Sequence, residues 1–517
     1  MGYTTFTSLG VKELLLGIKN LVCDGYLLLP SSLFASLLLF SIPAAAGHMG
    51  LDVLNGVGLA LVGDYLIGLT FPMVAATMYQ AYISRSIQSG NWESVRLTFQ
   101  RTALIWLALF LIIHVPILCN WELILLVAKQ DSKLAHLAQI FIFIQLPRYF
   151  ATYISYICLM TLFAQDAVWP TFLANLLNFV LVVIAEILVN IYHGGVYLLA
   201  IGVCVSQLLT TAFVIVIFIV KEAQCDHLNL LIFDTSNLFE WSEMFCQTIL
   251  SIVQHIGTRC IMEVGVIIGG MLSPVELGAA TILRRYTAFV SSIPLNLMAP
   301  VVCKSISSSI GKRSHVSVKV YIFSALLFVF SIGVLLTLIN VLFREQIAAL
   351  MTSMPSVVAV TASLTIIVSF MDWIALVYMT NIFIFRGLGA MTFPTIISFS
   401  FQYCFALPLS IFLVFTANMH LTGYYLALCI SFLLEIFVDN GYLHLYNLPA
   451  LIERMQSTEV EQQPLNAKRS LATFEAEFPQ PPQTWSWVTR CCLLIFLALF
   501  VNSIALGIHF STNYFLD

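Results

Sequence analysis

The sequence has little charge: only 9% of its 517 residues are Asp, Glu, Lys or Arg. Soluble domains carry about 25% charged residues, so this composition excludes an ordinary soluble domain. Hydrophobic residues make up 60% of the chain and the mean hydropathy is +0.96, which predicts an all-α integral membrane protein in a lipid bilayer. The formal net charge of −4 argues against nucleic acid as a partner.

The sequence also lacks the usual motifs of enzymes and ATP-driven pumps. It contains no GxGxxG or Walker loop, no GxSxG, no HExxH and no soluble nucleotide-binding domain. Its 12 cysteines are scattered through apolar runs, without a CxxC pair or a His/Cys cluster. We therefore expect no catalytic site, no metal and no cofactor.

The chain does contain many long hydrophobic runs. A helix needs about 20 apolar residues to cross a bilayer, and thirteen segments have this character. They lie near residues 27–47, 54–83, 99–119, 134–164, 168–192, 195–220, 243–271, 275–303, 316–342, 357–385, 391–416, 420–445 and 487–510.

The positions of Lys and Arg indicate the topology, because these residues collect in cytosolic loops. With the N-terminus in the cytosol, fifteen of the 22 lie inside, three outside and four within helices. We expect a cytosolic N-terminus (1–26), a first six-helix lobe (27–220), a cytosolic loop (221–242), a second six-helix lobe (243–445), a cytosolic linker (446–486) and a last helix (487–510) that leaves the C-terminus outside.

The two predicted lobes share short sequence matches in the same order. They are "GHMGLDVLNGVGLAL" from Gly47 with "GMLSPVELGAATIL" from Gly270, "VWPTF" from Val168 with "TFPTI" from Thr392, and "GGVYLLA" from Gly194 with "TGYYLAL" from Thr422. Six is an even number of spans, so both copies start on the same side and form a parallel repeat. Such repeats favour a transporter whose substrate site lies between the lobes.

The seventh predicted helix has one polar stripe, in which Ser251, His255, Arg259 and Glu263 recur at every fourth residue. A stripe of this kind faces the bundle interior or a cavity, since charge is costly against lipid. Two interpretations stay open. Glu263 either binds a proton or cation as a coupling carboxylate, or it forms an i, i+4 ion pair with Arg259 that only holds the helix in place.

Other polar side chains in apolar runs are the acids Asp64, Glu186 and Asp372, the amide Asn178, and the bases Arg148, Arg284 and Arg285. Each acid is either a coupling site or the structural partner of a buried base. Arg284 and Arg285 are adjacent, so they point about 100° apart and cannot share one carboxylate.

Several of these stretches resemble the multidrug and toxin extrusion (MATE) family, in its animal form with a thirteenth helix. The resemblance covers about residues 27–445. It is carried by "GHMGLDVLNGVGLAL", "SGNWESVRLTFQRTAL", "KQDSKLAHLAQIFI", "MEVGVIIGGMLSPVELGAATI", "FRGLGAM" and "ALPLSIF". It implies two six-helix lobes in a V, and export of organic cations, drugs and other xenobiotics in exchange for protons, in an apical-type plasma membrane.

The chain departs from the family pattern at several acids. Thr258 stands at the first acidic position of the seventh helix, with Arg259 at the following aromatic one, while the second acid is kept as Glu263. Ala375 replaces the acid of the tenth helix, one turn from Asp372, and Arg285 replaces an acid of the eighth.

From these patterns we expect Glu263, Asp372 and Asp64 to couple transport to protons or cations. We expect the substrate cavity to include Thr258, Arg259, His255, Arg285, Glu186 and Asn178. The alternatives are a protein of the same fold that moves an anionic or neutral solute, a membrane component without transport activity, and a flippase for lipid-linked sugars.

Overall fold

A computed structural model describes residues 11–49, 51–127, 132–192, 194–222, 242–351 and 355–445, and these are helical almost throughout. The elements are α1 (Val11–Gly25), α2 (Leu28–Met49), α3 (Leu51–Gly63), η2 (Asp64–Leu69), α4 (Thr70–Gln88), α5 (Trp92–Leu109), η3 (Phe110–His114), α6 (Val115–Cys119), α7 (Trp121–Val127), α8 (Ser132–Ala164), α9 (Trp169–Tyr192), α10 (Gly195–Glu222), α11 (Ser242–Leu272), α12 (Pro274–Gly311), α13 (His315–Leu342), α14 (Arg344–Met351), α15 (Pro355–Leu388), α16 (Thr392–Phe399), η5 (Ser400–Ala406), α17 (Leu407–Ile411), η6 (Phe412–Thr416) and α18 (His420–Leu445).

Ten helices in the described residues are long and apolar enough to cross a membrane, or eleven if the bent pair α1 and α2 counts as one span. The expected span at 134–164 is helical as α8, but Gln145, Pro147 and Arg148 interrupt its apolar character. The expected span at 487–510 lies outside the described residues. The fold class is confirmed, whereas the count of thirteen stays a prediction.

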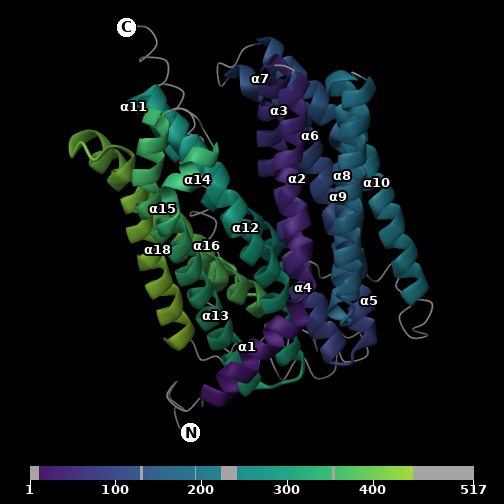
Figure 1. The fold of residues 1–517 in the computed structure, drawn as a ribbon. Coiled ribbons are helices and arrows are strands. Elements are labelled where there is room, and N and C mark those ends of the chain that lie inside the picture. The colour runs from purple at the N-terminus through teal and green to yellow at the C-terminus, as the bar shows by residue number, and fades with distance from the viewer. Residues whose placement is uncertain are drawn as a thin grey trace.

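The helices form two lobes, as the repeat predicts. The N-lobe comprises α2–α10 and the C-lobe comprises α11–α18; in Figure 1 the N-lobe is on the right and the C-lobe on the left. Each lobe has its own buried apolar core, one built around Tyr149 and Phe141 and the other around Tyr378 and Phe432. The helices of the two lobes converge on the side where the chain's N-terminus lies and splay apart toward the opposite side.

A stretch of π-helix, η2, interrupts the membrane span between α3 and α4. Such insertions widen one turn and commonly occur at functional sites. Here η2 begins at Asp64 and includes Tyr65, and both side chains lie on the wall of a cavity between the lobes.

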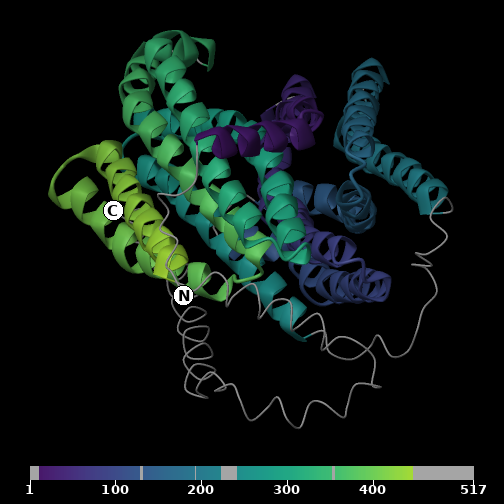
Figure 2. The same ribbon diagram turned by 90° about the horizontal axis from the view of Figure 1, so that it is seen from below.

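The helix α1 belongs to the N-terminal end of the chain but packs on the C-lobe. It meets α2 at a bend of 55° and crosses beneath the C-lobe in Figure 2. The Ser324 hydroxyl of α13 donates a hydrogen bond of 3.0 Å to the backbone oxygen of Leu14 in α1.

The lobes touch directly on the N-terminal side of the molecule. Lys304 Nζ of α12 lies 2.7 Å from Asp166 Oδ1 in the turn after α8, and this Lys304 side chain is only 6% exposed. Arg85 of α4 donates a hydrogen bond of 3.4 Å to the backbone oxygen of Gly387 at the end of α15. These contacts join the two lobes on this side.

The closest approach of the two lobes here requires a glycine. A methyl group at Gly311, the last residue of α12, would lie 2.5 Å from the backbone oxygen of Arg85 in α4. Only hydrogen fits in this space, so α12 and α4 can pack directly against each other.

Gly311→Ala should therefore push the lobes apart, at a cost of about 1–3 kcal/mol for overpacking. Gly441→Ala in α18 is the matched control, because a methyl group there meets nothing within 4 Å. In thermal unfolding of the purified protein, Gly311→Ala should lower the Tm relative to Gly441→Ala. Equal Tm values for the two variants would contradict the tight contact.

Candidate functional site

Two adjoining cavities lie between the lobes. The larger has a volume of about 390 Å³ and is lined by α2, α3, η2, α8, α9 and α10 of the N-lobe and by α11 and α12 of the C-lobe. The smaller, of about 190 Å³, lies against α4, α11, α12 and α15 among others. The two share the lining residues Ala35, Tyr156, Asn175, Arg284 and Ala288. They therefore share part of their wall, and we call the two together the binding space, which both lobes line.

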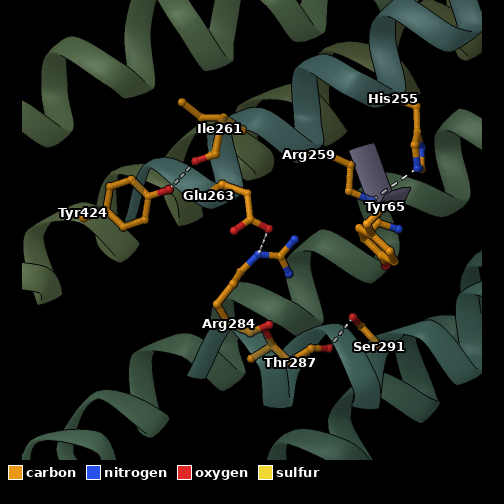
Figure 3. A network of polar contacts seen from close by, with 9 residues as sticks. All are labelled: Tyr65, His255, Arg259, Ile261, Glu263, Arg284, Thr287, Ser291 and Tyr424. Carbon is orange, nitrogen blue, oxygen red and sulfur yellow. Dashed lines mark hydrogen bonds and ion pairs between the residues drawn. The ribbon is translucent and has the colours of Figure 1, made fainter. Parts of the chain in front are cut away.

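The carboxylate of Glu263 pairs with Arg284, not with Arg259. Arg284 Nε donates to Glu263 Oε1 at 2.9 Å, which joins α12 to α11 (Figure 3). The expectation of an Arg259–Glu263 pair is wrong, because the base on the neighbouring helix takes the carboxylate. The side chain of Glu263 is 39% exposed and that of Arg284 is 11% exposed, so the pair stands at the cavity wall.

Arg259 instead reaches across to the other lobe. Its Nη1 donates to the Tyr65 hydroxyl of η2 at 2.9 Å, and its guanidinium lies 5.1 Å from the centre of the Tyr65 ring. Its Nε donates to His255 Nε2 at 3.3 Å (Figure 3). Both partners are neutral acceptors, so the positive charge of Arg259 is not cancelled by these contacts.

A second ion pair lies in the wall of the N-lobe. Arg148 Nη1 donates to Asp64 Oδ1 at 3.1 Å, and both side chains are buried, with 10% and 5% exposure. Asp64 therefore lies in the wall of the larger cavity and is paired with a base.

Asp372 lines the smaller cavity and makes no hydrogen bond or ion pair with another described residue. Arg284, which Glu263 also binds, lines the same cavity, and its positive charge acts on Asp372. Two carboxylates of the C-lobe thus lie around one guanidinium. Ala375, where the resemblance implies an acid, lines the same cavity.

The other expected cavity residues divide into two groups. Thr258 and His255 line the smaller cavity, and Arg285 and Asn178 line the larger one. Glu186 lines neither of these two cavities. It is buried on α9, where Ser41 of the packed helix α2 lies within hydrogen-bonding reach.

The charges around the cavities are unequal. The acids are Asp64, Glu263 and Asp372, and the bases are Arg148, Arg259, Arg284, Arg285 and Arg386. Two bases are held in ion pairs, whereas Arg285 has no hydrogen-bond or ion-pair partner among the described residues. The binding space therefore carries a positive excess.

Sequence reasoning missed several polar residues of this region. Tyr65 lies in an apolar run and gave no signal, because its partner Arg259 is on a distant helix. Arg386, which seemed to lie in a cytosolic loop, lines the smaller cavity as part of α15. Glu435 and Asp439 are fully buried in α18, and their four-residue spacing in an apolar run was a signal that could have found them.

Within the described residues, no group of three or more His, Cys, Asp or Glu side chains comes together as a metal site. What the geometry offers is a solute-sized space between two lobes, lined by ion pairs and uncancelled arginines. Together with the membrane-spanning helices, this defines a multi-pass membrane protein of the small-molecule transporter class.

Known proteins agree with this class. The family model described as MatE matches residues 29–189 and 251–416, one segment in each lobe. The chain belongs to the MatE family, whose transporters move small-molecule substrates across membranes. It is 26% identical over 406 residues to multidrug and toxin extrusion protein 2 of Pongo abelii. The aligned region covers 74% of this chain and 68% of that protein.

Solved structures share the fold. A eukaryotic MATE transporter superposes with a TM-score of 0.78 at 17% identity, over 86% of this chain and all of that one. A MOP superfamily transporter from Pyrococcus furiosus gives a TM-score of 0.74 at 16% identity, over 84% of this chain and 96% of that one.

The two ion pairs should differ in their contribution to stability. Asp64→Asn leaves Arg148 buried without a carboxylate, which costs about 3–5 kcal/mol. Glu263→Gln breaks a pair whose acid is partly exposed, so solvent screens the charge and the cost is about 0–1 kcal/mol. Thermal unfolding should show a much lower Tm for Asp64→Asn, and the double variant with Arg148→Gln should recover part of the loss. An equal loss in both single variants would mean that the environments of the pairs are alike.

Proposed function

We propose that the protein is a secondary active transporter that exports small organic solutes in exchange for protons, by alternating access of the cavity between its lobes. The observation that carries this proposal is the binding space lined by both lobes, with a carboxylate in its wall, Asp372, that forms no ion pair with any described residue. Rocking of the lobes would expose such a space to each side of the membrane in turn.

The proposed direction follows from the topology predicted by the Lys and Arg residues. With a cytosolic N-terminus, the contacts of Lys304 and Arg85 lie on the cytosolic side and hold it closed. The structure then corresponds to a state that faces outward. We place the protein in the plasma membrane, with its C-terminus outside the cell.

For the coupling step, Asp372 is the best placed of the three expected carboxylates. Asp64 is held by Arg148, and Glu263 by Arg284. Asp372 makes no ion pair with a described residue, yet its negative charge interacts with the positive charge of Arg284. When Asp372 loses its proton, it competes with Glu263 for this guanidinium, and a proton neutralises it again. Proton exchange at Asp372 would thereby rearrange the cavity wall.

Organic cations are the substrates that the resemblance implies, and the name of the Pongo abelii relative describes extrusion of drugs and toxins. A second candidate, export of an anionic solute, is favoured by the excess of arginine around the cavities. The structure of the Pyrococcus furiosus transporter is described as having a binding pocket of reversed polarity, which suggests a different function for that protein. The sign of the cavity charge separates the two candidates.

Transport by reconstituted vesicles should reveal this sign. Under an imposed pH gradient, we expect faster flux of the anion fluorescein than of the cation ethidium. Arg259→Trp should raise ethidium flux, because an uncancelled charge 6 Å from a cation opposes it by about 3 kcal/mol at an effective dielectric of 20. Arg344→Gln, on a base that lines neither cavity, is the control. Faster ethidium flux in the unaltered protein would support the cation candidate instead.

Asp372→Asn should separate proton coupling from solute binding. The amide keeps the shape of the side chain but cannot bind and release a proton. We expect flux driven by the pH gradient to fall at least about tenfold, while exchange of labelled for unlabelled solute at equal pH continues. Glu263→Gln serves as the comparison. If Glu263→Gln loses gradient-driven flux and Asp372→Asn does not, Glu263 is the coupling carboxylate.

A further inference from the structure

The interior of the C-lobe holds two acids that the proposed transport step does not use. Glu435 and Asp439 lie one turn apart on α18 and are 0% and 1% exposed. No base among the described residues forms an ion pair with either. A carboxylate buried in a membrane protein is costly when ionised, and two carboxylates this close repel each other when both are charged. The pair is therefore most stable when it holds a proton.

Hydrogen-bond donors surround Glu435 but not Asp439. Gln402 Nε2 donates to Glu435 Oε2 at 3.2 Å, and the Ser431 hydroxyl donates to Oε1 at 3.2 Å. The hydroxyl of Ser398 also lies close enough to this carboxylate to stabilise its charge. Asp439 Oδ1 is buried without a hydrogen-bond partner among the described residues. Glu435 thus has groups that bind its oxygens, whereas the neighbouring Asp439 has none in this part of the chain.

A row of hydroxyl groups connects Glu435 to the cavity. Thr258 lines the smaller cavity, and its hydroxyl lies 3.3 Å from the hydroxyl of Tyr378 on α15. The Tyr378 hydroxyl lies 2.7 Å from that of Ser398 on α16, which reaches Glu435. A hydroxyl both donates and accepts, so each member can receive a proton on one side and pass one on.

Two amides orient this row. Gln254 Nε2 and Gln402 Nε2 both donate to the Tyr378 oxygen, at 2.8 and 3.1 Å. With two donors on its oxygen, Tyr378 directs its own proton outward, and Ser398 is the closer acceptor. The hydrogen bond from Tyr378 to Ser398 therefore points away from the cavity, toward Glu435.

The only charged base joined to this network within the described residues is Arg386. Its Nη2 donates to Gln254 Oε1 at 3.4 Å, and its Nη1 donates at 3.3 Å to the Thr77 hydroxyl of α4, in the N-lobe. His255, on the same helix as Gln254, is turned toward Arg259. The network thus runs from the acid pair to a contact between the lobes.

We propose that Glu435 and Asp439 form a second proton-binding site of the transporter, loaded from the cavity through Thr258, Tyr378 and Ser398. In the loading step, solvent in the cavity gives a proton to the Thr258 end of the row. Each hydroxyl passes on the proton it held, and one O–H bond forms on the carboxylate. The site then carries one negative charge fewer, and nothing else changes covalently.

The effect of loading on transport rests on the proposed function. The negative charge of the acid pair attracts Arg386 through the polar network. A proton on the pair weakens this attraction and frees Arg386 to change its contact with Thr77. The proton site and the contact between the lobes are connected in this way, separately from Asp372.

Infrared difference spectroscopy tests the site without any solute. Spectra of the purified protein in acidic minus alkaline buffer should contain a carboxylic-acid C=O band that shifts in heavy water. Glu435→Gln combined with Asp439→Asn should remove one such band. Glu186→Gln, a buried acid that lines neither cavity, should leave that band in place. If the double variant keeps every band of the unaltered protein, the acids hold no exchangeable proton and the proposal fails.

Tyr378→Phe tests the route, because it removes the central hydroxyl and keeps both acids. The infrared band should remain, while fluorescein flux driven by a pH gradient should fall about tenfold or more and solute exchange at equal pH should continue. Unchanged gradient-driven flux would rule out the hydroxyl route. If the unaltered protein moves neither fluorescein nor ethidium in either assay, the proposed function fails, and the infrared result still decides whether the proton site exists.

Discussion

The cost of placing charge in the interior of a membrane governs the polar architecture of this protein. Each charged side chain there must be neutralised or surrounded by hydrogen-bond partners. The N-lobe meets this cost with a buried ion pair, Arg148 with Asp64. The C-lobe shares one base, Arg284, between two acids, and only Glu263 bonds it directly. The two lobes therefore differ in how their buried charges are neutralised, and the part of the cavity wall around Arg284 is free to change its charge.

The fold could be predicted from the sequence because its main signals are local. The length and apolarity of each run locate a helix, and the short matches after Gly47, Val168 and Gly194 indicate the duplication. These signals depend on periodicity within about 30 residues, where composition decides the structure. The bent N-terminal helix α1 was not foreseen, since its apolar face is matched by α13, more than 300 residues away in sequence.

The site could be predicted only in part. The stripe of the seventh helix contains His255 and Arg259, which line the smaller cavity, and Glu263, which lines the larger one. The hydrogen-bond and ion-pair partners of these residues could not be predicted, because the spacing of residues along one helix does not show which side chains the neighbouring helix presents. Glu263 had a candidate base four residues away, yet Arg284 of the packed helix α12 takes it. The surroundings of Glu186 could not be predicted for the same reason, since they depend on the packing of α9 on α2.

The position of α1 connects the two lobes outside the cavity. It is covalently joined to the N-lobe at the turn of Tyr26 and Leu27, and it is docked on α13 of the C-lobe (Figure 2). Any rotation of one lobe against the other must therefore change the 55° bend or detach the helix. In the proposed transport cycle, a molecule that holds this bend fixed would stop the rotation of the lobes from outside the cavity, where a competing solute could not displace it.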